Sequence, residues 1–237
     1  MYDQTERPAF GGGAVFMAAL RLLRHHALAL IGFAALANLA LALLSTGVSL
    51  ALTGTASGPG GLLEYIFGPL IFALLVLRSS DALAGAQRPL GEQLRQVLAQ
   101  AWPLIALSLA ASLITAFGLL LLVVPGLYAA AVLLPLTPVI LFERAGWEGL
   151  ARSYALARPY AWPIVGVVLR MTLVGLVVLI PLILLMLPET AGGGGLLVLL
   201  LSVLGGAALV ALYAVAGYMI YLRLRELRDG GVSDVFR

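Results

Sequence analysis

Long runs of apolar residues without charge dominate this chain. The stretches 171–188 and 190–222 contain no acidic or basic residue. Runs of about 18 or more apolar residues are long enough to cross the hydrocarbon core of a bilayer. The pattern predicts an all-α, polytopic membrane protein built as a single integral membrane domain. We expect six transmembrane helices, at about 27–51, 61–77, 103–123, 127–142, 163–187 and 196–222.

Turn-forming residues separate the members of each predicted helix pair. Gly, Ser, Thr and Pro dominate 54–61, and glycines dominate 189–195. In the middle pair, only Val124-Pro125-Gly126 separates the third predicted helix from the fourth. Such segments favour reversal of the chain. We therefore predict three transmembrane hairpins, of which the middle pair is closely antiparallel.

Amphipathic segments precede each predicted hairpin, at 14–26, 90–101 and 146–158. In 90–101 the apolar positions follow helical spacing, and glutamines occupy the opposite face. This pattern predicts helices that lie on the membrane surface. The pentads AWPLI and AWPIV follow the second and third segments. They indicate either an internal repeat of a surface helix and a hairpin or ordinary amphipathic approaches to a span.

The arginines predict the orientation. All fourteen basic residues are Arg, and thirteen lie in the segments before the first hairpin, between hairpins or after the last. The turns inside the predicted hairpins carry none. Because short cytoplasmic loops hold the positive charge, both termini and the amphipathic helices are predicted to lie on the cytoplasmic side. The fourteenth arginine, Arg170, falls inside a predicted span.

Composition narrows the possible chemistry. Only 11% of the residues are charged, compared with about 25% in soluble domains. Because there is no cysteine, disulfides, thiolate metal sites and cysteine nucleophiles are excluded. There is no lysine for a Schiff base or a phosphate loop, and no paired carboxylates or HExxH motif. We expect a protein that is not an enzyme, has no cofactor or metal, and does not bind nucleic acid.

Arg170 is the first candidate functional residue. A charge inside the bilayer is costly and usually has a partner or a wet path. Arg170 either reaches back to the cytoplasmic headgroups or forms an ion pair. Glu143, at the cytoplasmic end of the fourth predicted span, is the expected partner.

Polar residues inside other spans form a second candidate group. Ser108, Ser112 and Thr115 share one stripe of the third predicted helix, and Asn38 lies near the middle of the first. They either stabilise helix packing or line a polar path. Glu64, near the outer end of the second helix, is either a proton or cation site or a solvated interfacial carboxylate.

A basic cluster precedes the first span. Arg21, Arg24, His25 and His26 fall at the predicted headgroup level and suit contact with anionic lipid. Neighbouring histidines on a helix point about 100° apart and cannot bind one metal ion from the same face.

The stretch 124–164 resembles a bacterial family of six-helix inner-membrane proteins. That family includes the membrane domain attached to some glycerophosphodiester phosphodiesterases and stand-alone proteins of unknown function. The resemblance implies the six-helix fold and a place in the bacterial cytoplasmic (inner) membrane. It does not imply phosphodiesterase activity, because that chemistry belongs to a separate soluble barrel that this sequence lacks. The matching positions are Pro125, Gly126, Pro135, Pro138, Glu143, Leu150, Ser153, Leu156 and Trp162.

Two classes of function are consistent with the sequence. The first is a non-catalytic scaffold, assembly factor or accessory subunit that contacts membrane lipids and another membrane protein or a second copy of itself. The alternative is a small transporter or channel for a lipid or a small solute, with its path among the polar residues above. The low number of charges within the spans favours the first, because transporters usually contain more polar groups there.

Overall fold

The computed structural model describes residues 10–55, 60–86, 88–185 and 195–229. Within these ranges the protein is helical and has no strand. The elements in chain order are α1 (Gly12–His25), α2 (Ala27–Thr53), α3 (Gly61–Ala84), α4 (Leu90–Leu98), α5 (Ala101–Leu121), α6 (Val123–Leu133), α7 (Leu136–Glu143), η1 (Gly146–Glu148), α8 (Gly149–Ala157), η2 (Arg158–Tyr160), α9 (Ala161–Leu185) and α10 (Gly195–Asp229).

Six helical stretches in the described part of the chain are long and apolar enough to cross a membrane. They coincide with the six predicted spans, which confirms the all-α class and the multi-pass character of the protein. Their mean hydropathies lie between 1.7 and 2.4. Some of these helices end at other residues than predicted, and local packing explains the differences.

The second long helix extends further than predicted. The prediction ended it at residue 77 because Arg78 follows, but α3 continues to Ala84 and ends at Gly85. Gly85 adopts a left-handed conformation with φ of 64°, which is favourable for glycine at a helix end. As a result, Arg78 and Asp81 belong to the helix rather than to the following loop.

The fourth predicted span is broken into α6 and α7. Pro135 lies between them, and proline lacks the N–H that would continue the helical hydrogen-bond ladder. Pro138 lies in the first turn of α7, where a missing N–H is tolerated. Ser153 is fully buried and donates a hydrogen bond to the Val132 carbonyl at 2.9 Å. The Val132 carbonyl lies close to the break between α6 and α7, and Ser153 provides it with a hydrogen-bond donor.

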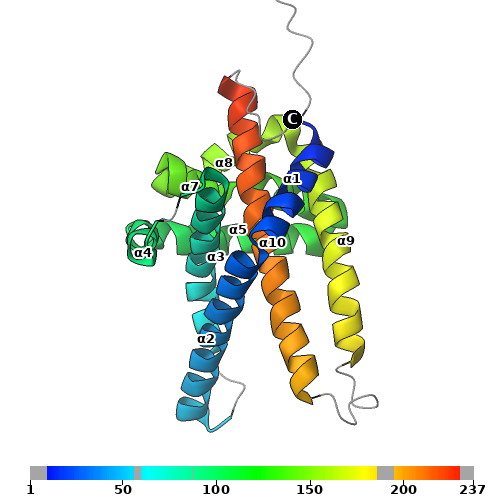
Figure 1. Ribbon diagram of the computed structural model, residues 1–237. Coiled ribbons are helices and arrows are strands. Elements are labelled where there is room, and N and C mark those ends of the chain that lie inside the picture. Colours follow the sequence, from blue (N-terminus) through cyan, green and yellow to red (C-terminus); the bar gives the residue numbers. More distant parts are fainter. Residues whose placement is uncertain (1–9, 56–59, 87, 186–194, 230–237) are drawn as a thin grey trace, which may run out of the picture.

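α10 is the central helix of the bundle and contacts α1, α2, α3 and α9 (Figure 1). Small side chains allow these contacts, and Ala207, Ala211 and Ala214 are all buried. The axes of α2, α3, α9 and α10 are broadly aligned along the bundle, and the chain runs one way in α2 and α9 and the opposite way in α3 and α10 (Figure 1).

α5 runs crosswise to these helices and packs against α3, and α6 packs against α5 (Figure 1). Tyr128, near the start of α6, has its ring 6.3 Å from that of Trp162 at the start of α9. Phe142, near the end of α7, has its ring 5.4 Å from Tyr218 and 5.9 Å from Tyr221 in the last part of α10. The start of α9 and the end of α10 lie at one end of the bundle, because these helices pack antiparallel.

These contacts correct the predicted path of 103–142. The prediction took this stretch to the far side of the membrane and back, with the turn at Val124-Pro125-Gly126 opposite the arginine-rich segments. In the structure the residues next to this turn contact the arginine-rich end instead. The length and apolarity of α5 and α6 are those of a span, but their direction is set by packing against α8 and α9.

At the other end of the bundle, α2 and the start of α3 approach very closely. The Gly60 N–H donates to Ser49 Oγ at 3.0 Å. A Cβ atom on Gly60 would lie 1.8 Å from the Ser45 carbonyl oxygen, whereas one on Gly61 would meet nothing within 4 Å. Only glycine fits at position 60.

Gly60→Ala is therefore expected to destabilise the protein, because α2 and α3 must separate to admit the methyl group. We expect a loss of about 1–3 kcal/mol, measured as a lower thermal unfolding midpoint in detergent. Gly61→Ala is the matched control and should change the midpoint little. Equal effects of the two substitutions would contradict the close approach.

Candidate functional site

The most extensive polar cluster in the described residues surrounds Asp81, near the end of α3. The Asp81 side chain is buried and both of its carboxylate oxygens are engaged. Arg88 Nε donates to Oδ1 at 2.6 Å, and Gln93 Nε2 donates to Oδ2 at 2.7 Å. Gly85 makes this possible, because its left-handed conformation turns the chain so that Arg88 and α4 return to α3.

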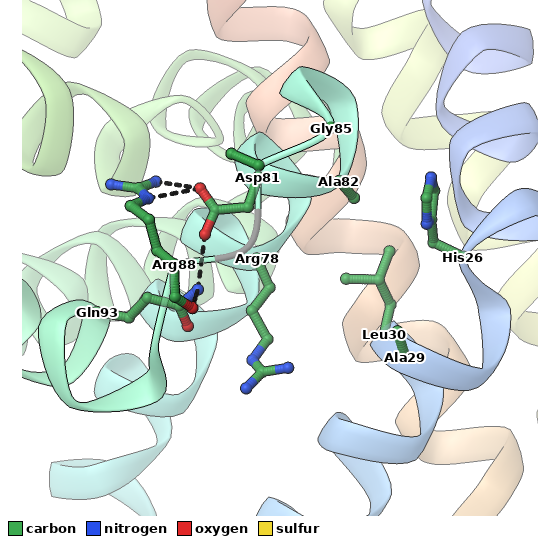
Figure 2. A pocket seen from close by; sticks show the side chains of 10 residues that line it. His26, Ala29, Leu30, Arg78, Asp81, Ala82, Gly85, Arg88 and Gln93 are labelled. Atoms are coloured by element: carbon green, nitrogen blue, oxygen red, sulfur yellow. Dashed lines mark hydrogen bonds and ion pairs between the residues drawn. The ribbon is translucent and has the colours of Figure 1, made fainter.

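A pocket of about 350 Å³ lies beside this cluster (Figure 2). One wall comes from the last turns of α3 and the start of α4, and the other from the junction of α1 and α2. The lining combines cationic and polar groups with short apolar side chains. The lining residues are His26, Ala29, Leu30, Arg78, Asp81, Ala82, Gly85, Ala86, Arg88 and Gln93.

Arg78 is the cation in this pocket that the cluster does not neutralise. Figure 2 shows its side chain directed away from the Asp81–Arg88 pair. Its guanidinium carbon lies 4.2 Å from the centre of the Phe33 ring, a cation–π contact. Its Nε is buried and has no hydrogen-bond partner among the described residues.

The hydroxyl groups next to the pocket are engaged by their own helix. Ser79 donates to the Leu75 carbonyl, and Ser80 donates to the Leu77 carbonyl, each at 2.7 Å. Neither has a neighbouring base, which a serine nucleophile needs. No group of three potential metal ligands occurs in the described part of the chain. The pocket therefore presents the Arg78 guanidinium, whose Nε has no partner among the described residues, beside an aspartate that is already paired.

The predicted pair between Glu143 and Arg170 is not formed. Glu143 Oε2 instead accepts a hydrogen bond from Arg152 Nε at 2.6 Å. α8 packs back on α7 and brings Arg152 to Glu143, while Arg170 lies on α9 beside the start of α1. The packing of α8 on α7 decides the partner here.

Arg170 is exposed and extends toward the start of its own helix. Its Nη1 donates to the Gly166 carbonyl at 3.3 Å and lies 3.9 Å from the position of a Cβ on Gly12 at the start of α1. The side chain thus extends toward the start of α9, and whether it reaches the headgroups stays a prediction.

The candidate polar-path residues are not brought together. Asn38 donates to the Ala34 carbonyl at 2.8 Å, and Ser112 donates to the Ser108 carbonyl at 2.9 Å, so each bonds within its own helix. Ser112 and Thr115 line an open groove of about 410 Å³ between α5 and α6, which Asn38 does not reach.

Glu64 lies in the first turn of α3, apart from the other candidate polar residues. The carboxylate of this exposed residue accepts a hydrogen bond from Ser45 Oγ at 3.0 Å, which links the start of α3 to α2.

The basic cluster on α1 divides between two environments. Arg21, Arg24 and His25 are exposed. His26 is the residue between α1 and α2, and it lines the pocket that contains Arg78.

Gly126 and Trp162, two of the positions at which 124–164 resembles the six-helix family, have clear packing roles. Gly126 is buried against α5, and a Cβ there would lie 2.5 Å from the Leu119 backbone nitrogen. Trp162 is 66% exposed and contacts Tyr128. The motif therefore contains residues that hold α6 against α5 and α9.

The pocket does not follow from the predicted spans, because they end at residue 77 and place Arg78 in a loop, whereas Arg78 lies in α3. The spacing of Arg78 and Asp81 by three residues, followed by Gly85, is consistent with a helix that continues to a glycine end. That pattern could have placed both charges on α3. It could not have paired Asp81 with Gln93, which depends on the return of α4.

Comparison with protein-family models gives no match, and no curated protein and no solved structure matches the chain significantly. The resemblance of 124–164 to the six-helix inner-membrane family stays a prediction. The class of protein is defined by the fold alone, as an all-α multi-pass membrane protein.

The Glu143–Arg152 pair is expected to be energetically coupled. Its side chains are 22% and 36% exposed, so solvent weakens the interaction, and we expect a coupling of about 0.5–1 kcal/mol. The measurement is a double-mutant cycle of Glu143→Gln and Arg152→Gln in denaturant unfolding in micelles. Glu143→Gln combined with Arg170→Gln is the control and should be additive. Coupling to Arg170 and not to Arg152 would restore the original prediction.

Proposed function

We propose that this chain is a non-catalytic integral membrane protein that acts as a scaffold, assembly factor or accessory subunit. We place it in the bacterial cytoplasmic membrane with both termini in the cytoplasm. It works through contacts with membrane lipid and with another membrane protein or a second copy of itself. The observation that carries this proposal is the uncovered apolar surface of α5, which lies across the bundle.

Most of the apolar surface of α5 is not covered by the described residues, although α6 packs along one side of it. Only 6% of its most apolar window is buried, compared with 50% for α6 and α7 together. Leu113, Phe117 and Leu120 are 51%, 61% and 80% exposed. Exposed apolar surface of this extent is typical of contact with a membrane or another protein.

The arrangement supports a specific placement in the bilayer. α2, α3, α9 and α10 cross the membrane, and the α5–α6 pair lies in the cytoplasmic leaflet with its apolar surface against acyl chains. Four crossings keep both termini on one side. In this placement all the arginine-rich segments still lie on one side of the membrane, as the charge rule requires. The uncharged turn between α5 and α6 lies within the leaflet.

Other observations support a role without catalysis. The hydroxyl groups beside the pocket are engaged by backbone carbonyls. The charged side chains of Asp81 and Glu143 each have an arginine partner. These groups hold elements together and leave no activated nucleophile or base among them.

The contacts do not favour the transporter alternative. A transport path needs polar groups that converge near the middle of the membrane. Asn38 and the Ser108–Thr115 stripe lie on α2 and α5, and no extensive contact joins these two helices.

The placement of α5 and α6 can be tested by labelling introduced cysteines, because the chain has no native cysteine. Thr55→Cys, at the end of α2, should react with a membrane-impermeant maleimide added outside intact spheroplasts. Val124→Cys, at the turn between α5 and α6, should not react from outside. External labelling of both positions would show that α5 and α6 cross the membrane, as in the six-span arrangement.

A second labelling experiment tests the scaffold against the transporter. Asn38→Cys should resist small, impermeant thiol reagents from either side, because the residue lies in a helix packed without a water path. Arg95→Cys, exposed on α4, is the positive control in opened membranes. Rapid labelling of Asn38→Cys would indicate a water-filled path and would support the transporter.

A further inference from the structure

We infer that the pocket around Arg78 binds a phosphate monoester or diester group. The proposed scaffold function names membrane lipid in general but assigns no binding site, and this inference goes beyond it. It rests on that proposal only in treating the bound group as held and not converted.

The first step is the charge of the pocket. Asp81 is the only carboxylate among its lining residues, and both of its oxygens accept hydrogen bonds from Arg88 and Gln93. Arg88 also donates to Ser80 Oγ at 3.2 Å and to Gln96 Oε1 at 3.3 Å. The aspartate is therefore satisfied without Arg78, and the pocket retains one positive charge.

The second step is the position of that charge. Arg78 is partly buried six residues before the end of α3, and no ion pair or hydrogen bond to it occurs among the described residues. A cation that is partly removed from water and has no anionic partner is costly, and charged groups in membrane proteins usually have a partner. The Phe33 ring supports one face of the guanidinium but does not neutralise it. An anionic ligand would neutralise the charge of this guanidinium.

The third step is the composition of the opposite wall. His26, Ala29 and Leu30 come from the junction of α1 and α2, and the positive end of the α2 dipole lies there. His26 offers a ring N–H, while Ala29, Leu30 and Ala82 offer apolar contact. Figure 2 shows His26, Ala29 and Leu30 on the opposite side of the pocket from the Asp81 cluster.

This combination matches a phosphate group better than a neutral polar ligand. Guanidinium groups bind phosphate oxygens with two parallel hydrogen bonds. A volume of about 350 Å³ can hold such a group with the first atoms attached to it. The phosphate can come from a lipid headgroup or from a soluble compound, and the experiment distinguishes the two.

The test uses the purified full-length protein in detergent, after removal of bound lipid. Three probes are titrated while thermal unfolding and native mass spectra are recorded: dioleoyl phosphatidic acid, dioleoylglycerol and inorganic phosphate. Wild type should bind phosphatidic acid and not dioleoylglycerol, which lacks the phosphate. Arg78→Gln should weaken this binding at least about tenfold, the loss expected for a charge-assisted contact.

Arg95→Gln is the matched control, because it removes an equal charge from an exposed position on α4. It should leave binding unchanged. If Arg78→Gln does not fold, Ala82→Leu tests the same pocket, because the larger side chain fills it without changing charge. It should weaken binding to a similar degree.

The outcomes separate the sources of the phosphate. Arg78-dependent binding of phosphatidic acid alone identifies a lipid headgroup. Arg78-dependent stabilisation by inorganic phosphate identifies a site for soluble phosphate compounds. Equal losses in Arg78→Gln and Arg95→Gln, unchanged binding in Arg78→Gln and Ala82→Leu, or no binding of either phosphate probe would overturn the inference. These failures would not alter the labelling expected at positions 38 and 124, which tests the scaffold proposal separately.

Discussion

The buried Asp81 carboxylate organises one end of this protein, because a charge out of water must be matched by fixed partners. Arg88 and Gln93 supply those partners from the segment after α3. The chain turns back at Gly85, and the hydrogen bonds from Arg88 and Gln93 to Asp81 then hold α4 against α3. Gln96, on α4, then donates to the Leu141 carbonyl on α7 at 3.5 Å. The start of α5 and the end of α7 are thereby tied to the same cluster.

The orientation of α5 follows from these ties together with the contacts of α6. Once α4 is fixed beside α3, α5 begins at Ala101 and is buried mainly near its first turns, at Leu104 and Leu107. α6 returns along α5 and meets α8 and α9. α5 packs against α3, and α6 packs against α8 and α9. These contacts hold the α5–α6 pair across the bundle rather than along it. Its outer surface is left to lipid or to another protein.

Glycine allows much of the close helix packing. A Cβ on Gly149 would lie 2.7 Å from Ile140, and one on Gly217 would lie 3.3 Å from the Leu134 carbonyl oxygen. Between apolar helices in a membrane the hydrophobic effect gives little attraction, so close van der Waals contact at small residues becomes more important. Gly60 and Gly126 act in the same way at the α2–α3 and α5–α6 contacts. The few charged groups then serve mainly to fix the ends of elements.

The sequence by itself determined the helical class, the six apolar segments and most of their limits, because apolar length and turn residues are local properties. It also identified Arg170, Glu143 and His26 as notable, but the partner it predicted for Glu143 was wrong. Only the tertiary structure paired Glu143 with Arg152, placed Arg78 and His26 in one pocket and laid α5 and α6 across the bundle. Hydropathy measures how apolar a segment is and carries no information about its direction. Direction and pairing depend on contacts between residues far apart in the chain, and these are decided when the helices pack.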